Sequence, residues 1–426
     1  MKKLLITGGA RLSGTVRIHG AKNSVLPVLA ACCLCTSPCV LHNCPDIEDV
    51  RTALAILESL GCKTRREGST LCIDASGLSK FCVEKRLAGK MRSSILFLGA
   101  LLARCGKAEL ALPGGCPLGE RPIDLHVKSL AKLGARFRFE RGILQAAWRE
   151  RRDGDIFLSI PSVGATENLL LACALMNGTV TLHGAAREPE ITDLIGFLRA
   201  AGADIRGAGS GDITIRGVKK LHGATYTILP DRIETATYLC MAAGCGGEVE
   251  LQRCDGRLLA PVIGCLREAG CEINCDGSEI ALKSSGRLTA VFPVTTAPYP
   301  GFPTDAQALL MAAVLRAKGE SVFRETVFER RFLHVPELQK LGADIVLSGK
   351  TARVRGVAHL HGAMLRAEDL RGAAALITAG LLAEGESEVL GLSHLARGYE
   401  NLEQNLKNLG ASIKSVDIPA PFVYNT

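Results

Sequence analysis

The most distinctive chemical group in this sequence is the thiol of Cys116, in the segment LPGGCPLGERPID (Leu112–Asp124). Buried structural cysteines usually lie on apolar helices or strands, whereas this one is surrounded by glycine and proline. Arg121 follows in the same segment. A flexible loop with a nearby cation suits a reactive thiol. A free surface thiol is the common alternative for an isolated loop cysteine, and the loop alone leaves both interpretations open.

A second set of chemically active residues gathers at the starts of six apolar segments. The segments open AKNSVLPVLAA, KMRSSILFLGA, GATENLLLACA, DRIETATYLCM, PTDAQALLMAA and DLRGAAALITA. Acidic residues there can be ordinary caps, but lysine and arginine oppose the helix dipole. Cations at helix N-termini favour an anion site. The polar residues at these starts are Lys22, Asn23, Arg92, Asp231, Arg232, Glu234, Asp305, Asp369 and Arg371.

These six segments belong to a repeat that runs through the chain. Each is apolar on nearly every face, which predicts a buried helix, and a short strand follows it. A second helix then ends at a glycine, in LESLGCKT, LAKLGARF, LRAAGADI, LREAGCEI, LQKLGADI and LKNLGASI. The glycine predicts a left-handed helix stop followed by a new strand. Cys116 lies in the longest copy, so its loop is interpreted as an insertion.

The repeat predicts an α/β protein of six β-α-β-α-β-β units, arranged as two lobes of three units each. A chain of 426 residues is also too long for one typical core. We expect the buried helices to direct their N-termini at a shared cleft. The third unit ends near Pro230.

Composition narrows the function class. The formal net charge is +8, but lysine and arginine are scattered and aromatics make up only 4%, which disfavours nucleic acid and favours small anionic ligands. No uninterrupted apolar run approaches the roughly 18 residues of a membrane helix. The 17 cysteines are spread over the chain without paired CxxC motifs, so we expect reduced thiols in a cytoplasmic protein.

Nine motifs in order resemble the UDP-N-acetylglucosamine 1-carboxyvinyltransferase family, the enolpyruvyl transferases of peptidoglycan synthesis. They are GAKNSVLPVLAA, LPGGCPLGERPIDLH, PSVGATEN, AAREPEI, LPDRIETATY, PGFPTDAQALLMA, TVFERRFLHVPEL, DLRGAAALI and ARGYE. The resemblance implies the inside-out α/β barrel, with two lobes of three repeats each. It places residues 1–21 and 230–426 in one lobe and residues 22–229 in the other.

The resemblance also implies the reaction, which transfers the enolpyruvyl group of phosphoenolpyruvate to the 3′-hydroxyl of UDP-N-acetylglucosamine and releases phosphate. Such an addition needs an acid for C3 and a base for the hydroxyl. Cys116 matches the family's proton donor, which is also the target of fosfomycin. Asp305 matches the candidate base, with Asp369 as a rival, while a plain helix cap remains the structural alternative for Asp305.

Further residues match the family's substrate contacts. Catalytic roles are implied for Lys22 and Arg397 beside Cys116 and Asp305, and supporting roles for Arg331 and Asp369. The phosphoenolpyruvate set comprises Lys22, Asn23, Arg121, Arg371 and Arg397. The UDP-N-acetylglucosamine set comprises Arg92, Arg121, Pro122, Ile123, Asp124, Leu125, Pro161, Ser162, Val163, Gly164, Asp305 and Val327.

The sequence contains no dinucleotide fingerprint, Walker loop or metal-ligand cluster, so we expect no cofactor and no metal. Three alternatives remain. The shikimate-pathway enolpyruvyl transferase shares the fold and donor but lacks the cysteine loop. A non-catalytic nucleotide-sugar-binding paralogue would lose the acid or the base, and a nucleic-acid-binding protein rests on net charge alone.

Overall fold

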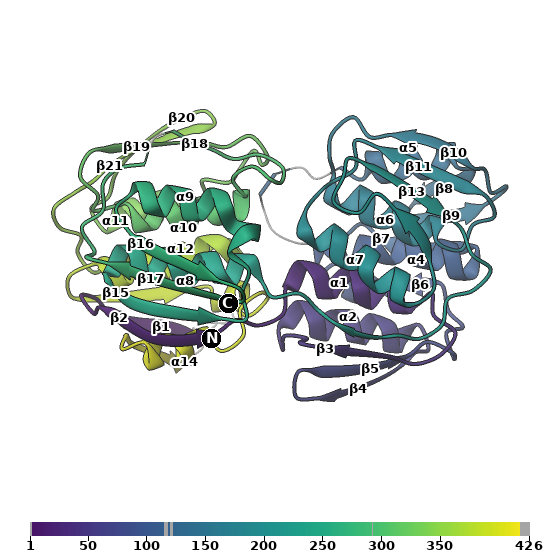
Figure 1. Cartoon of the computed structure of the whole chain (residues 1–426), viewed down its shortest axis with the longest axis horizontal. Coiled ribbons are helices and arrows are strands. Elements are labelled where there is room, and N and C mark those ends of the chain that lie inside the picture. Colours follow the sequence, from purple (N-terminus) through teal and green to yellow (C-terminus); the bar gives the residue numbers. More distant parts are fainter. Residues whose placement is uncertain (1, 115–117, 120–121, 292, 418–426) are drawn as a thin grey trace, which may run out of the picture. The chain divides into compact units, whose positions relative to one another are not determined.

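The computed structural model describes residues 2–114, 118–119, 122–291 and 293–417. Cys116 and Arg121 lie outside the described residues. By their internal contacts, the described residues divide into two compact units (Figure 1). Unit 1 comprises residues 2–18, 118–119 and 232–417, and unit 2 comprises residues 19–114 and 122–231. Each unit has its own hydrophobic core.

Unit 2 carries three four-stranded sheets in the described part of the chain. Its strands are β3 (Cys39–His42), β4 (Lys63–Glu67), β5 (Thr70–Asp74), β6 (Cys82–Val83), β7 (Lys107–Ala111), β8 (Ala135–Glu140), β9 (Ile143–Trp148), β10 (Gly154–Phe157), β11 (Thr179–His183), β12 (Asp204–Arg206), β13 (Asp212–Arg216) and β14 (Thr225–Thr227). Its helices are α1 (Lys22–Cys32), α2 (Glu48–Ser59), α3 (Lys85–Ala88), the 3-10 helix η1 (Arg92–Ile95), α4 (Leu96–Cys105), α5 (Asp124–Lys132), α6 (Val163–Cys173) and α7 (Pro189–Ala200).

Unit 1 also carries three four-stranded sheets among the described residues. Its strands are β1 (Lys2–Thr7), β2 (Leu12–Arg17), β15 (Gly247–Gln252), β16 (Glu272–Asp276), β17 (Glu279–Ser284), β18 (Val294–Thr295), β19 (Glu320–Arg324), β20 (Asp344–Ser348), β21 (Thr351–Arg355), β22 (Met364–Arg366), β23 (Glu386–Leu390) and β24 (Ser412–Asp417). Its helices are α8 (Arg232–Cys245), the 3-10 helix η2 (Gly256–Leu259), α9 (Ala260–Glu268), α10 (Thr304–Ala313), α11 (Val335–Lys340), α12 (Leu370–Leu382), α13 (Leu392–Leu395) and α14 (Leu402–Asn408).

All six sheets share one pattern, in which a parallel pair of strands is extended by two further strands, each antiparallel to its neighbour. In the sheet β6-β7-β9-β8, for example, β6 runs parallel to β7, and β7 and β8 both run antiparallel to β9. Three sheets are completed by distant segments, and in one of them β2 pairs with β15 in unit 1. β14 pairs with β3 in unit 2, and β1 inserts between β23 and β24 in unit 1. The predicted β-α-β-α-β-β repeat is therefore confirmed. In each unit, a strand from a distant part of the chain completes at least one of the sheets.

The apolar helices form the centre of each unit, as the sequence predicts. In unit 1, α10 contacts both α8 and α12, and in unit 2, α4 contacts α1 and α6. Almost every residue of these helices is buried. Gly99 shows why small residues are needed there, because a Cβ atom on it would lie 2.4 Å from the carbonyl oxygen of Asn168 on α6. The close approach of α4 and α6 depends on that missing side chain.

The six repeat glycines end the outer helices in the predicted way. Their φ angles lie between 90° and 102°, in the left-handed region that glycine tolerates best. After α2, the N–H of Gly61 donates to the carbonyl of Glu58 and the N–H of Cys62 donates to that of Leu57, which is a Schellman motif. The chain then turns directly into β4. The six glycines are Gly61, Gly134, Gly202, Gly270, Gly342 and Gly410.

None of the helices among the described residues combines the length and the apolar character that crossing a membrane requires.

Candidate active site

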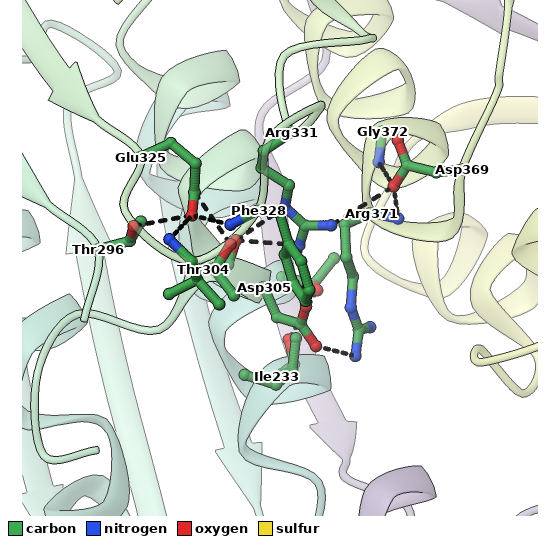
Figure 2. A network of polar contacts seen from close by, with 12 residues as sticks. Ile233, Thr296, Thr304, Asp305, Glu325, Phe328, Arg331, Asp369, Arg371 and Gly372 are labelled. Atoms are coloured by element: carbon green, nitrogen blue, oxygen red, sulfur yellow. Dashed lines mark hydrogen bonds and ion pairs between the residues drawn. The ribbon is translucent and has the colours of Figure 1, made fainter. Parts of the chain in front are cut away.

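Asp305 is the centre of a network of charged side chains in unit 1. It is the second residue of α10, whose N-cap is Pro303, so Asp305 is not itself the capping residue. Its Oδ1 accepts a hydrogen bond of 2.9 Å from Arg331 Nη2, and its Oδ2 accepts one of 3.2 Å from Arg371 Nη2. The Asp305 side chain is 28% exposed, whereas that of Arg331 is 1% exposed. Two largely buried cations therefore orient a carboxylate that solvent can reach (Figure 2).

Arg331 binds the backbone beside Asp305 as well as its side chain. Its Nε and Nη2 both donate to the carbonyl oxygen of Thr304, at 3.1 and 2.9 Å. A planar guanidinium group can make such a forked contact, and this geometry restrains both the position and the rotation of the acceptor. Arg331, for which the family resemblance implies a supporting role, therefore contacts both the backbone of Thr304 and the side chain of Asp305.

Asp369, the rival candidate base, has a different environment. It is the N-cap of α12, and its Oδ1 accepts 3.0 Å hydrogen bonds from the N–H groups of Arg371 and Gly372. Arg331 Nη1 lies 3.8 Å from the same oxygen, and the Asp369 side chain is only 3% exposed. A carboxylate that caps a helix and is almost fully buried is poorly placed to meet a substrate hydroxyl. The geometry therefore favours Asp305 for contact with substrate.

His334 is also buried, close to Asp369 and Arg331. Burial lowers its pKa to about 4, with the positive charge of Arg331 contributing and Asp369 opposing the shift. The imidazole is therefore neutral at physiological pH. Neutrality is consistent with its place beside Arg331, because a second buried cation there would be costly.

Arg371 contacts Tyr399 of the ARGYE motif, the same motif that contains Arg397. The guanidinium carbon of Arg371 lies 5.4 Å from the centre of the Tyr399 ring. The Tyr399 hydroxyl forms a 2.8 Å hydrogen bond with the hydroxyl of Thr237 on α8. Arg397 precedes Tyr399 in the segment after α13 and is partly exposed. The Tyr399 ring of this motif thus packs against the guanidinium group of Arg371 and steadies it through an aromatic face.

In unit 2, Lys22 is the first residue of α1. Its Nζ forms a 2.8 Å ion pair with Asp49 Oδ2, and its backbone N–H donates to Asp231 Oδ2 at 3.1 Å. The Lys22 side chain is 12% exposed, so most of its length is packed against protein and its position is well defined. Asn23 follows at the same helix start and is exposed.

Two candidate nucleotide-sugar segments are joined by a buried pair, His126 and Asn168. The Oδ1 of Asn168 accepts from the N–H of Gly99 at 2.8 Å, which fixes the orientation of the amide. Its Nδ2 therefore donates to His126 Nδ1 at 2.9 Å and to the carbonyl of Gly164 at 3.4 Å. Burial and the nearby charge of Arg92 lower the pKa of His126 to about 4, so its imidazole is neutral. The pair holds the start of α5 beside the start of α6.

The remaining candidates lie at or near these segments in unit 2, except Val327, which follows β19 in unit 1. The Ser162 hydroxyl caps α6 by accepting from the N–H of Ala165 at 3.4 Å, as expected for a segment that opens a helix. Asp124 is the first residue of α5 and forms a 3.0 Å ion pair with Lys128. Arg92 begins η1, immediately before α4. Pro122, Ile123, Leu125, Pro161, Val163 and Val327 are exposed or partly exposed.

Several residues of these networks, including His334 and Tyr399, were not identified as candidates from the sequence. Asp49, His126 and Asn168 appear above, and Glu325 binds the segment before Asp305 from its far side. His126 and Asn168 do lie inside the motifs RPIDLH and PSVGATEN, so motif membership could have identified them. Asp49 has no local signal, because its partner Lys22 is remote in the chain.

The comparisons with known proteins show the family of this chain. Residues 6–406 match the family model described as EPSP synthase (3-phosphoshikimate 1-carboxyvinyltransferase). The chain is 46% identical over 413 residues to UDP-N-acetylglucosamine 1-carboxyvinyltransferase 2 of Caldanaerobacter subterraneus subsp. tengcongensis, covering 97% of this chain and 99% of that one. It is 48% identical over 412 residues to UDP-N-acetylglucosamine 1-carboxyvinyltransferase of Gloeobacter violaceus, covering 96% and 90%.

Solved structures place the fold in the same group. The crystal structure of the enolpyruvyl transferase NikO from Streptomyces tendae matches with a TM-score of 0.89 at 30% identity, covering 98% of this chain and 99% of that one. EPSP synthase from Acinetobacter baumannii matches with a TM-score of 0.74 at 18% identity, which shows a shared fold. On these grounds the chain belongs to the enolpyruvyl transferase family and, within it, to the family of UDP-N-acetylglucosamine 1-carboxyvinyltransferases.

Proposed function

We propose that this protein transfers the enolpyruvyl group of phosphoenolpyruvate to the 3′-hydroxyl of UDP-N-acetylglucosamine and releases phosphate, the first committed step of peptidoglycan synthesis. The observation that carries the proposal is Asp305, a partly exposed carboxylate held by the buried guanidinium groups of Arg331 and Arg371. Such a group is suited to orient a hydroxyl and to accept its proton. Relatives at 46–48% identity over almost the whole chain carry the corresponding enzyme name.

The addition step needs one base and one acid. Asp305 takes the proton of the sugar 3′-hydroxyl while the hydroxyl oxygen forms a bond to C2 of phosphoenolpyruvate. The Cys116 thiol gives its proton to C3, which becomes a methyl group. In the elimination, the C2–O bond to phosphate breaks and phosphate leaves, taking the proton held by Asp305. The Cys116 thiolate takes a proton from C3, so the carbon–carbon double bond of the enolpyruvyl group, now attached to the sugar oxygen, is restored.

Phosphoenolpyruvate carries a phosphate and a carboxylate, so its binding needs several positioned cations. We assign this role to Lys22, Arg121, Arg371 and Arg397, with Asn23 as a further polar contact. Lys22 is suited to it because Asp49 and the surrounding protein define its position before substrate arrives. Lys22 and Arg397 also act catalytically, because fixed positive charge stabilises the phosphate as it leaves.

The nucleotide-sugar is assigned to Pro122–Leu125, Pro161–Gly164, Arg92, Arg121 and Val327. The start of α6 supports this assignment, since N–H groups at a helix N-terminus attract a diphosphate. The addition and the elimination move protons and break one C–O bond without a redox change, so we propose that no cofactor or metal takes part. The partners are the two small-molecule substrates.

We propose that the enzyme acts in the cytoplasm. Every cysteine among the described residues is a free thiol, including several close neighbours around the end of α1. Free thiols in such number suit a reducing compartment.

One assay tests the function. Purified protein is incubated with phosphoenolpyruvate and either UDP-N-acetylglucosamine, shikimate 3-phosphate or no acceptor, and phosphate release is measured. The proposal predicts release with the nucleotide-sugar only. Phosphate release with shikimate 3-phosphate would identify the sister enzyme instead. A non-catalytic paralogue would release no phosphate with either acceptor.

A further inference from the structure

Glu325 is a buried carboxylate that the proposed reaction does not use. It follows β19 and its residue is 1% exposed. Its Oε1 accepts hydrogen bonds from the Thr296 hydroxyl at 3.0 Å, the Val327 N–H at 2.8 Å and the Phe328 N–H at 3.0 Å. Its Oε2 accepts one from the Thr304 hydroxyl at 3.0 Å. Four donors therefore converge on one carboxylate (Figure 2).

The direction of these bonds is well determined. Two donors are backbone N–H groups, which can only donate. The Thr296 hydroxyl accepts the N–H of Thr326 at 2.9 Å, so its own hydrogen is available for Glu325. Burying a carboxylate without a cation is costly, and several hydrogen bonds to the charged form compensate for the lost hydration. Among the described residues no ion pair to Glu325 occurs, so neutral donors alone hold it.

The four donors come from segments with different proposed roles. Thr304 opens α10 and immediately precedes Asp305, the proposed base. Val327 is a proposed contact of the nucleotide-sugar, and Phe328 follows it in the same turn. Thr296 lies just after β18, on the edge of the sheet. Glu325 thus ties the segment of the base to the segment that meets the acceptor substrate.

Thr304 is held from two sides. Arg331 binds its carbonyl oxygen, while Glu325 binds its hydroxyl. With both contacts, the first turn of α10 cannot shift along the helix axis without breaking a buried hydrogen bond. A displacement of about 1 Å between a catalytic group and its substrate can cost roughly 100-fold in rate, so this restraint matters for the chemistry.

We propose that Glu325 is a positioning residue for the transfer reaction, which sets the distance between Asp305 and the acceptor hydroxyl by binding Thr304 and the Val327–Phe328 turn with one carboxylate. The inference rests on the proposed function. It differs from a purely structural role in one measurable way. If Glu325 positions Asp305, loss of the Thr304 contact alone lowers kcat by more than the accompanying loss of stability can explain.

Thr304→Val tests this directly, because valine keeps the shape of threonine and removes only its hydroxyl. We expect kcat with UDP-N-acetylglucosamine to fall by about 10- to 100-fold, while KM for phosphoenolpyruvate changes by less than about threefold. Thr304→Ser restores the hydroxyl, and we expect it to recover most of the lost kcat. Thermal unfolding is measured on each variant to separate turnover from stability.

Thr296→Val is the matched control, since it removes a hydroxyl from the same carboxylate on the side away from Asp305. We expect it to lower the melting temperature at least as much as Thr304→Val does, and to lower kcat by less than about threefold. Glu325→Gln retains the three acceptor contacts of Oε1, and its amide can donate to Thr304, so it should retain most of the turnover. Glu325→Ala should lose about 100-fold.

Three results would overturn the inference. Thr304→Val could turn over like the wild type, Thr304→Ser could fail to recover kcat, or both valine variants could lose kcat in proportion to stability. These outcomes are separate from failure of the proposed function, which would appear as absence of phosphate release with UDP-N-acetylglucosamine in the wild-type enzyme. That last result would overturn both.

Discussion

Arg331 and Asp305 form a 2.9 Å ion pair in which the cation is buried and the carboxylate is partly exposed. The same guanidinium group donates two hydrogen bonds to the carbonyl of Thr304. It therefore holds both the Asp305 side chain and the backbone in the first turn of α10. Asp305 is consequently oriented before any substrate binds. An oriented carboxylate needs little reorganisation when the hydroxyl arrives, which favours fast proton transfer.

Asp305→Asn removes the proposed base while preserving the size of the side chain. We expect substrate binding to remain largely intact and kcat to fall by about two to four orders of magnitude, the usual range for loss of a general base. Steady-state phosphate release measures both. Asp369→Asn is the comparison, since asparagine can still cap α12 with its oxygen and should cost less. Near-normal turnover in Asp305→Asn would transfer the base role to Asp369.

Arg331→Lys keeps the charge but cannot reproduce the forked contact with Thr304 and Asp305. We expect kcat to fall by about 10- to 100-fold and the free energy of unfolding to fall by about 1–3 kcal/mol. Denaturant unfolding and phosphate release measure the two effects. Arg330→Lys, on the exposed neighbour, is the control and should change neither. An Arg331→Lys enzyme with wild-type kcat would show that the fork does not orient the base.

Cys116 should be the most reactive thiol, and fosfomycin should inactivate the enzyme by alkylating it. Cys116 lies outside the described residues, so this prediction rests on the sequence. Among the described cysteines, Cys82 and Cys275 are exposed competitors. For Cys82, partial burial of the sulfur and the charges of Glu109 and Glu84 raise its pKa and disfavour the thiolate. Peptide mass mapping should find the adduct on Cys116 rather than on Cys82 or Cys275.

The nucleotide-sugar should accelerate this labelling. Cys116→Asp should resist fosfomycin, because a carboxylate is a poorer nucleophile, and can retain activity as a proton donor. An adduct on another cysteine, or full sensitivity of Cys116→Asp, would contradict the role assigned to the loop.

His126 should make the protein less stable as the pH falls from about 6.5 to about 4. Its pKa in the folded protein is about 4, so in this range the unfolded chain binds a proton that the folded protein does not. The free energy of unfolding therefore rises with pH across the window. His334 contributes with the same sign, whereas burial raises the pKa of Asp193 to about 6 and gives the opposite sign below that pH.

In His126→Gln, unfolding should take up about one proton fewer, so the free energy of unfolding should change less with pH. Urea unfolding at pH 7 and pH 5 measures this change. His361→Gln, which replaces an exposed imidazole, is the control and should leave the slope unchanged. If His126→Gln kept the full slope, protonation of His126 would not account for the acid sensitivity.

Much of the fold could be predicted from the sequence because its signals are local. A glycine after a helix reports a left-handed backbone angle at that residue, and all six repeat glycines adopt it. A segment that is apolar on every side reports a buried helix wherever its partners lie. The motif residues around Asp305, Lys22 and Ser162 were identified for a similar reason, since each motif is a short continuous segment with a recognisable order of residue types.

Tertiary structure decided the relationships between segments that are remote in the chain. The packing of each whole unit determines that β1 completes a sheet with β23 and β24. It also determines that Asp49 pairs with Lys22. Glu325 looks like an ordinary charged residue after a strand until the fold brings Thr296 and Thr304 to its two oxygens. A carboxylate and a hydroxyl carry no mark of their partners in sequence, because hydrogen-bond specificity comes from distance and direction, and only the packed backbone sets these.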